Sequence, residues 1–258
     1  MNSTTAPACF TRREPLAEYL ACTDYVSSSA VRRFLRTGRA PALALIPDAI
    51  SRDTSLGDAF HALLLEPERF EDDFVQADRH APAPAAGDET GLMARTWLSA
   101  RDCEALQRMR NAVLNYTRLP LAGWLADGEK ELSLYWQGVV GGRWKGRPDC
   151  FSDEIVLEIK TAADVRPARF GKSRKRYGYD LQAALYLEGI EFLTGRRPRF
   201  LYVSVETSPP HPVWIHEPST QELATATAEL DVARAQFLRG LAAPLANSDV
   251  AGPATADP

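Results

Sequence analysis

The segment RPDCFSDEIVLEIKT carries two acidic residues and a lysine at a spacing that suits metal-dependent chemistry. Within IVLEIKT, the period of two of a strand places Glu158 and Lys160 on the same face. The opposite face carries Ile155, Leu157 and Ile159. A buried charge without a partner is costly, so these two charges either pair with each other or a metal, or occupy the solvated side of an edge strand. The strand alone leaves both interpretations open.

Asp149 lies on the strand predicted immediately before, RWKGRPDCF, and a polar turn at residues 152–154 joins the two strands as a hairpin. Across this hairpin, Asp149 can approach Glu158. Two carboxylates at short range repel each other unless a cation lies between them, and oxygen ligands suit Mg²⁺, with Mn²⁺ as a substitute. Lys160, on the same face as Glu158, completes the charged group.

A metal ion held by Asp149 and Glu158 beside Lys160 is suited to phosphodiester hydrolysis. Such an ion lowers the pKa of a bound water and neutralises the charge that grows on the phosphate. The ammonium group orients the nucleophile or stabilises the phosphate oxygens. We therefore expect Asp149, Glu158 and Lys160 to be the catalytic residues.

Four further side chains are candidates for the same site. His61 lies on a predicted helix where Gly57, one turn earlier, leaves room for a metal or a strand, although a lone histidine among apolar residues is often structural. Glu131 begins the predicted strand ELSLYW and is either an accessory metal ligand or a solvated strand end. Gln182 and Tyr186 share one helical face, from which they contact a phosphate or base, or form half-buried surface.

The net charge of −4 and the pI near 5.7 argue mildly against a nucleic-acid partner. A local basic run, however, immediately precedes the predicted Gln182 helix and contains no acid. Its members are Arg166, Arg169, Lys172, Arg174, Lys175 and Arg176. Such a run is either ordinary solvated surface or a set of contacts to the DNA backbone. Arg174 and Lys175 are the candidates that we choose for DNA contact.

Length and composition indicate one large globular domain, with 258 residues, 45% hydrophobic and 25% charged. No apolar run approaches the roughly 20 residues of a membrane span, and the N-terminus lacks the pattern of a secretory signal, so we expect a cytoplasmic protein without a membrane partner. The four cysteines stand far apart without a CxxC pair, which favours reduced thiols over a zinc or iron–sulfur site.

The expected elements alternate between helices and strands. Helices are predicted at residues 14–22, 29–36 with Ser27 and Ser28 as candidate caps, 54–70, 102–116, 179–193 closed by Gly195, and after a capping box at Ser219 and Glu222. Strands are predicted at residues 131–136, 143–151, 155–161, 200–206 and 213–216. This order predicts a mixed central sheet flanked by helices on both faces, after a helical N-terminal region. We expect a single domain over 13–244, between flexible ends at 1–12 and 245–258.

Several segments together resemble the exonuclease VIII-like, RecE-type branch of the PD-(D/E)XK nuclease superfamily. They are GDAFHALLLEPERF, the E-x-S of Glu131 and Ser133, KGRPD, the EIK of Glu158 to Lys160, and YGYDLQAALY. The resemblance extends roughly from Ser27 to Glu206. It implies a restriction-endonuclease-like α/β/α fold in which His61, Asp149 and Glu158 bind a divalent metal, Lys160 is catalytic, and Gln182 and Tyr186 form the Q-xxx-Y pair. Glu158 departs from the aspartate that is common in this branch.

The resemblance also implies an activity and partners. The activity is metal-dependent digestion of double-stranded DNA from an end, with 5′ to 3′ polarity expected, in phage-type recombination or DNA repair. The implied partners are a single-strand annealing protein and further copies of the chain in a ring, in a bacterial or phage-encoded setting. A nuclease for single-stranded or flap DNA and a non-catalytic DNA-binding module with this fold remain as alternatives.

Overall fold

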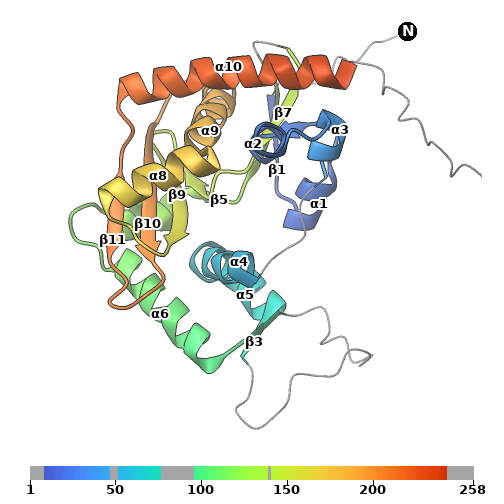
Figure 1. Ribbon diagram of the computed structural model, residues 1–258. Helices are drawn as coiled ribbons and strands as arrows, with labels where there is room; N and C mark the ends of the chain where they lie inside the picture. Colours follow the sequence, from blue (N-terminus) through green and yellow to red (C-terminus); the bar gives the residue numbers. More distant parts are fainter. Residues whose placement is uncertain (1–8, 47–51, 77–95, 139–140, 243–258) are drawn as a thin grey trace, which may run out of the picture.

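The computed structural model describes residues 9–46, 52–76, 96–138 and 141–242 (Figure 1). The helices are α1 (Leu16–Ala21), α2 (Ser28–Thr37), α3 (Pro41–Ala44), α4 (Arg52–Leu65), α5 (Pro67–Asp73), α6 (Ala100–Leu114), α7 (Leu121–Asp127), α8 (Pro167–Tyr177), α9 (Tyr179–Thr194) and α10 (Thr220–Ala242). The strands are β1 (Cys9–Arg12), β2 (Val26–Ser27), β3 (Phe74–Gln76), β4 (Thr96–Leu98), β5 (Glu129–Lys130), β6 (Ser133–Gln137), β7 (Arg143–Gly146), β8 (Cys150–Phe151), β9 (Ile155–Ala162), β10 (Arg199–Glu206) and β11 (Val213–His216).

A five-stranded mixed sheet in the order β11-β10-β9-β8-β5 forms the centre of the fold. Strands β9 and β10 run parallel, with Glu158 opposite Tyr202, and the other neighbours are antiparallel. On one face, Val156 packs into a core with residues of α9 and α10, and on the other, Leu157 packs with residues of α4 and α6. Figure 1 shows the sheet between these two layers of helices. The predicted α/β/α arrangement is confirmed.

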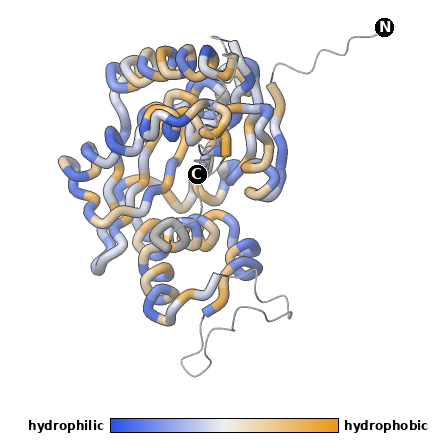
Figure 2. Tube along the Cα trace, turned by 45° about the vertical axis from the view of Figure 1, so that its right-hand side comes forward, coloured by the Kyte–Doolittle hydropathy of each residue, from blue (hydrophilic) through white to orange (hydrophobic). Residues whose placement is uncertain are grey.

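Hydrophobic and hydrophilic residues alternate along the helices that cover the sheet (Figure 2). In α10, Leu230, Ala233 and Phe237 are buried and Leu223 packs at the edge of the core. The capping box is also confirmed, because Ser219 N donates to Glu222 Oε2 at 2.8 Å and Glu222 N donates to Ser219 Oγ at 3.2 Å. Amphipathic period and cap chemistry are local properties, so they define where α10 begins and which of its faces is apolar without information from the rest of the chain.

The predicted strand over 143–151 is wrong as a single element. Strand β7 belongs to a four-stranded sheet in the order β1-β6-β7-β2, and β8 belongs to the central sheet. The chain crosses between the two sheets at Arg147, Pro148 and Asp149. Pro148 has no N–H to donate to a neighbouring strand, which favours a break at this point. The break places Asp149 at the entrance to the central sheet.

The helix predicted over 54–70 is divided into α4 and α5 at Glu66, because Pro67 begins a new helix and cannot continue the hydrogen bonding of the first. The basic run forms α8, a helix that the sequence analysis did not predict, which ends at Gly178 in the left-handed conformation (φ 65°). Helix α9 ends as predicted at Gly195, with φ 69°.

The N-terminal region is helical as expected, and Ser27 caps α2 by accepting a hydrogen bond from Ala30 N. Residues 9–12 do not belong to a flexible end, because they form β1 and pair with β6. The remaining residues of the two expected flexible ends, 1–8 and 245–258, lie outside the described part of the chain. So do residues 79–90, where prolines and alanines predict a surface loop. All four cysteines are free thiols, and no described helix has the length and apolarity that a membrane span requires.

Candidate active site

Asp149 and Glu158 meet where β8 runs beside β9. The register pairs Cys150 with Leu157, which brings Asp149 level with Glu158, and Asp149 Oδ2 accepts a hydrogen bond from Ile159 N at 2.6 Å. Both carboxylates are buried, with 7% and 1% of each residue exposed. Burial and the nearby charge of Glu158 raise the pKa of Asp149 well above its ordinary value. The two residues therefore form the close pair that strand alternation indicated.

Lys160 completes this group from the same face of β9. Its Nζ donates to Glu158 Oε1 at 2.5 Å and lies 4.9 Å from the ring centroid of Tyr179. Burial lowers the pKa of Lys160, but the charges of Glu158 and Asp149 outweigh this effect and raise the pKa overall. One ammonium thus faces two carboxylates. Glu158 Oε2 has no hydrogen-bond partner within the described residues, although it is buried.

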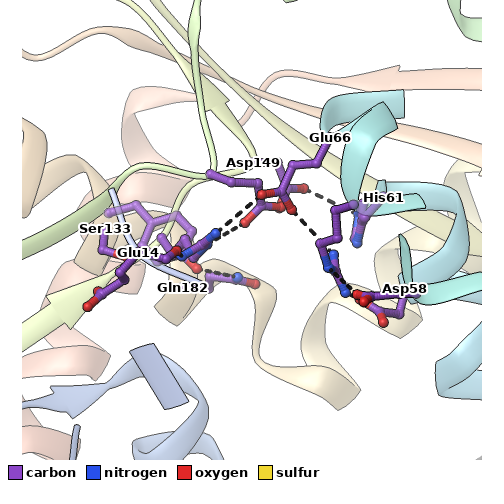
Figure 3. Close-up of polar contacts among 12 residues, drawn as sticks. Glu14, Asp58, His61, Glu66, Ser133, Asp149 and Gln182 are labelled. Atoms are coloured by element: carbon purple, nitrogen blue, oxygen red, sulfur yellow. Dashed lines mark hydrogen bonds and ion pairs between the residues drawn. The ribbon is translucent and has the colours of Figure 1, made fainter. Parts of the chain in front are cut away.

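His61 reaches Asp149 from α4 (Figure 3). Its Nε2 lies 2.9 Å from the carbonyl oxygen of Ile159 and 3.5 Å from Asp149 Oδ2. Gly57 allows α4 to lie close to β9, because a Cβ at this position would stand 3.3 Å from Thr161 Oγ1. The Ile159 carbonyl was missed by sequence analysis, because a backbone oxygen has no signature in the residue types.

Glu131 lies near this group but not on a strand. It has a left-handed backbone (φ 48°) two residues before β6, so the expectation that it begins the strand is wrong. Its Oε2 accepts a hydrogen bond from Arg147 Nε at 2.7 Å. Burial and the charge of Asp149 raise the pKa of Glu131 to about 7, against the opposing charges of His61 and Arg147.

Arg147 organises the side of the site that faces the N-terminal segment. It is almost fully buried and also donates to the carbonyl of Glu14 at 2.9 Å, to Ser133 Oγ at 3.2 Å and to Glu66 Oε1 at 3.5 Å. Figure 3 shows Glu14, Ser133 and Glu66 around this part of the site. Alternation along RWKGRPDCF also predicts Arg147 on the face of Asp149, but the sequence indicates no role for it there.

Gln182 and Tyr186 share the inner face of α9, as their spacing predicted. Both are buried, so the alternative of a half-buried helix surface is wrong. Gln182 Nε2 donates to the Tyr186 hydroxyl at 3.0 Å, and Gln182 Oε1 has no partner within the described residues. Burial raises the pKa of Tyr186, and the charge of Glu158 adds to this effect. Tyr186 therefore lies near enough to Glu158 to be affected by its charge, and Gln182 is joined to it by the hydrogen bond.

Arg174 and Lys175 have different surroundings, although they are adjacent on α8. Arg174 is 6% exposed, with guanidinium contacts of 2.9 Å to Asp180 and 3.0 Å to Glu222. The choice of Arg174 for DNA contact is wrong, because its donors are engaged inside the protein. Lys175 is exposed and lines a surface pocket between α2 and the junction of α8 and α9.

The residues around Asp149 and Glu158 fit a divalent cation. The described residues contain no group of three or more His, Cys, Asp or Glu side chains that could by themselves hold a metal. The Ile159 carbonyl, however, adds a backbone oxygen close to His61 and Asp149, and the orphaned Oε2 of Glu158 is a further oxygen donor. Hard oxygen ligands of this kind suit Mg²⁺ or Mn²⁺. His61 would have to release the Ile159 carbonyl to offer Nε2 to a metal.

Comparison with known proteins agrees with this fold. No curated protein matches the chain. A crystal structure from Eubacterium rectale, described as a "Putative exonuclease", is similar with a TM-score of 0.66 and 14% sequence identity, over 89% of this chain and 86% of the other. At this identity the likeness shows the fold. Residues 27–239 match a family model, and because the match extends over most of the sequence, the chain belongs to the family of PDDEXK-like domains of unknown function (DUF3799).

Proposed function

We propose that this protein is a magnesium-dependent exodeoxyribonuclease that hydrolyses double-stranded DNA from an end, with 5′ to 3′ polarity. The observation that carries the proposal is the buried group of Asp149, Glu158 and Lys160, in which two carboxylates face one ammonium and Glu158 Oε2 has no partner within the described residues. Membership of a PDDEXK-like family and the likeness to a structure described as a "Putative exonuclease" support the same class of reaction.

The proposed metal ligands are Asp149, Glu158, His61 and the carbonyl oxygen of Ile159. A divalent cation bound there supplies a water of lowered pKa and neutralises charge on the phosphate. Glu131 is an accessory ligand in this proposal, although Arg147 already binds its Oε2. Arg147 acts as a positioning residue, because its hydrogen bonds connect the Glu131 carboxylate with the backbone carbonyl of Glu14.

Lys160 donates hydrogen bonds in the proposed reaction. Its Nζ lies 2.5 Å from Glu158 Oε1, and this hydrogen bond holds the ammonium beside the carboxylates. From there it orients the attacking water and stabilises the charge on the phosphate oxygens. Gln182 and Tyr186, which face the same space from α9, hold the substrate strand through a phosphate or base. Lys175 contacts the DNA backbone from the surface.

The direct test uses linear duplex DNA labelled at one end, with magnesium added or chelated. We expect wild type to shorten the DNA only with magnesium, Glu158→Gln to be inactive, and Lys160→Ala to be slower by about 100- to 1,000-fold. Glu104→Gln, an exposed acid on α6, is the matched control. Circular duplex resists digestion if an end is required, and the label position reports polarity. Undiminished activity of Glu158→Gln and Lys160→Ala would remove the assignment.

A further inference from the structure

A basic pocket of about 530 Å³ lies between α2 and the junction of α8 and α9. Its volume falls in the range of ordinary ligand sites. Among its lining residues are Arg32 from α2, Lys175 and Arg176 from the end of α8, and Tyr177 and Tyr179 on either side of Gly178. These two walls are about 140 residues apart in sequence, and the fold brings their cations together.

Arg32, Lys175 and Arg176 of this pocket have no carboxylate partner within the described residues. Within the described residues, Lys175 and Arg176 have no salt bridge, in contrast to Arg174 beside them. Arg32 donates to the carbonyl of Tyr177 at 3.1 Å and to Ser29 Oγ at 3.0 Å, and its buried Nε has no partner there. No carboxylate therefore pairs with the Arg32 guanidinium in the described part of the molecule.

Two stacked tyrosines connect this pocket with the catalytic group. The rings of Tyr177 and Tyr179 lie 5.7 Å apart with an angle of 27° between their planes. The outer ring, Tyr177, belongs to a residue that is 48% exposed. The inner ring, Tyr179, lies under Lys160 Nζ, with 4.9 Å between Nζ and the ring centroid. An exposed aromatic face therefore leads directly to the lysine beside Glu158.

We propose that this pocket binds the unpaired end of the DNA strand that enters the active site. A base stacks on Tyr177, and the phosphates beside it contact Arg32 and Lys175. The inference rests on the proposed nuclease function and adds that the substrate end is single-stranded where it reaches the protein. Aromatic rings beside cations are the usual means of binding single strands without sequence preference.

The aromatic ring distinguishes this proposal from simple contact with a duplex backbone. Phosphate contacts need only cations, and the bases inside a duplex are stacked on each other and cannot stack on a side chain. The guanidinium of Arg176 lies over the Tyr177 ring, 5.5 Å from its centroid, and would move aside to let a base stack there. Its own plane can then stack on the base. The pocket thus offers base stacking as well as charge, and this combination favours an unpaired end.

The test measures binding of labelled DNA by the Glu158→Gln protein in a chelating buffer, with blunt duplexes and duplexes with a four-nucleotide single-stranded tail. Tyr177→Ala should weaken binding of the tailed DNA by roughly 5- to 150-fold and leave the blunt duplex nearly unchanged. Tyr177→Phe should restore binding because it keeps the ring. Lys175→Ala should weaken binding of both DNAs. It should also lower the slope of the logarithm of the binding constant against the logarithm of the salt concentration by about one.

Equal losses on blunt and tailed DNA with Tyr177→Ala, or no loss on either, would overturn the proposal. Thermal unfolding of each variant shows whether the fold is intact, which we expect because Tyr177 is half exposed. Cleavage of linear duplex by wild type with magnesium is measured in parallel. If wild type cleaves DNA but Tyr177→Ala binds tailed DNA as well as the parent protein does, only the proposed pocket is refuted. If tailed DNA binds through Tyr177 but wild type cleaves no DNA, the proposed nuclease function is refuted.

Discussion

Asp149→Asn should separate the stability of the protein from its metal binding. In the metal-free protein, Asp149 and Glu158 are two buried carboxylates beside one ammonium, that of Lys160. The asparagine oxygen can still accept the hydrogen bond from Ile159 N, now 2.6 Å long. The substitution therefore removes one like charge without loss of the backbone contact. We expect the metal-free variant to be at least as stable as wild type.

The sign of the pH effect follows from the raised pKa of Asp149. A carboxyl whose pKa is higher in the folded state stabilises the fold while it is protonated, and this contribution is lost as pH rises through the folded pKa. Metal-free wild type should thus lose stability as pH rises from the ordinary aspartate pKa to the raised pKa of Asp149, and lose no more from this group at higher pH. Asp149→Asn should lose less, because residue 149 no longer titrates.

Magnesium should reverse the order of the two proteins. A ligand present at 100 times its dissociation constant stabilises the native state by about 2.7 kcal/mol. For a domain of this size, each kcal/mol raises Tm by roughly 2–4 °C, so saturating magnesium should raise the Tm of wild type by about 5–11 °C. Asp149→Asn loses a charged ligand and should show little of this increase.

The assay is thermal unfolding after chelation, followed by titration with magnesium. Asp153→Asn is the matched control, because Asp153 is exposed in the turn between β8 and β9 and should keep the full metal response. An equal magnesium-dependent rise in Asp149→Asn and wild type would refute the reasoning. So would a wild-type protein whose Tm is unaffected by both Mg²⁺ and Mn²⁺.

Three further substitutions distinguish chemistry from structure. Lys160→Ala should keep a magnesium-dependent rise in Tm but lower the rate of DNA hydrolysis by about 100- to 1,000-fold, the loss typical of one stabilising donor in a kinetic assay. Arg147→Met should lower the free energy of unfolding by about 3–5 kcal/mol in denaturant titrations, because it leaves Glu131 buried without its partner. The control is Arg108→Met, on the exposed face of α6, which should change the free energy of unfolding by less than about 1 kcal/mol. Arg174→Met should lower stability in the same assay by an amount comparable to Arg147→Met, while the salt dependence of DNA binding stays as in wild type, since the Arg174 guanidinium is engaged inside the protein. A reduced salt slope for Arg174→Met would contradict this interpretation.

Local physical chemistry made much of the candidate site predictable. The period of two along β9 places Glu158 and Lys160 on one face, and the spacing of four along α9 does the same for Gln182 and Tyr186. Both patterns depend only on neighbours in the chain. The caps at Ser27 and Ser219 and the glycine that ends α9 were predictable for the same reason.

Other features depend on contacts between distant segments. Pro148 favours a break in a strand, but it does not show that β7 and β8 belong to different sheets. That separation is visible only in the tertiary structure. Arg174 differs from Lys175 because Glu222, 48 residues away, lies against its guanidinium. Residue type and helical position do not contain that information.

The amino-acid sequence by itself determined which residues of the site share a face, because alternation within one strand or helix is set by backbone geometry. Only the tertiary structure decided that the Ile159 carbonyl joins His61 and Asp149. It alone also decided that the pocket beside Tyr177 adjoins Lys160, through the ring of Tyr179. These neighbours come from different elements, and their approach depends on how the helices pack on the sheet, which residue spacing does not encode.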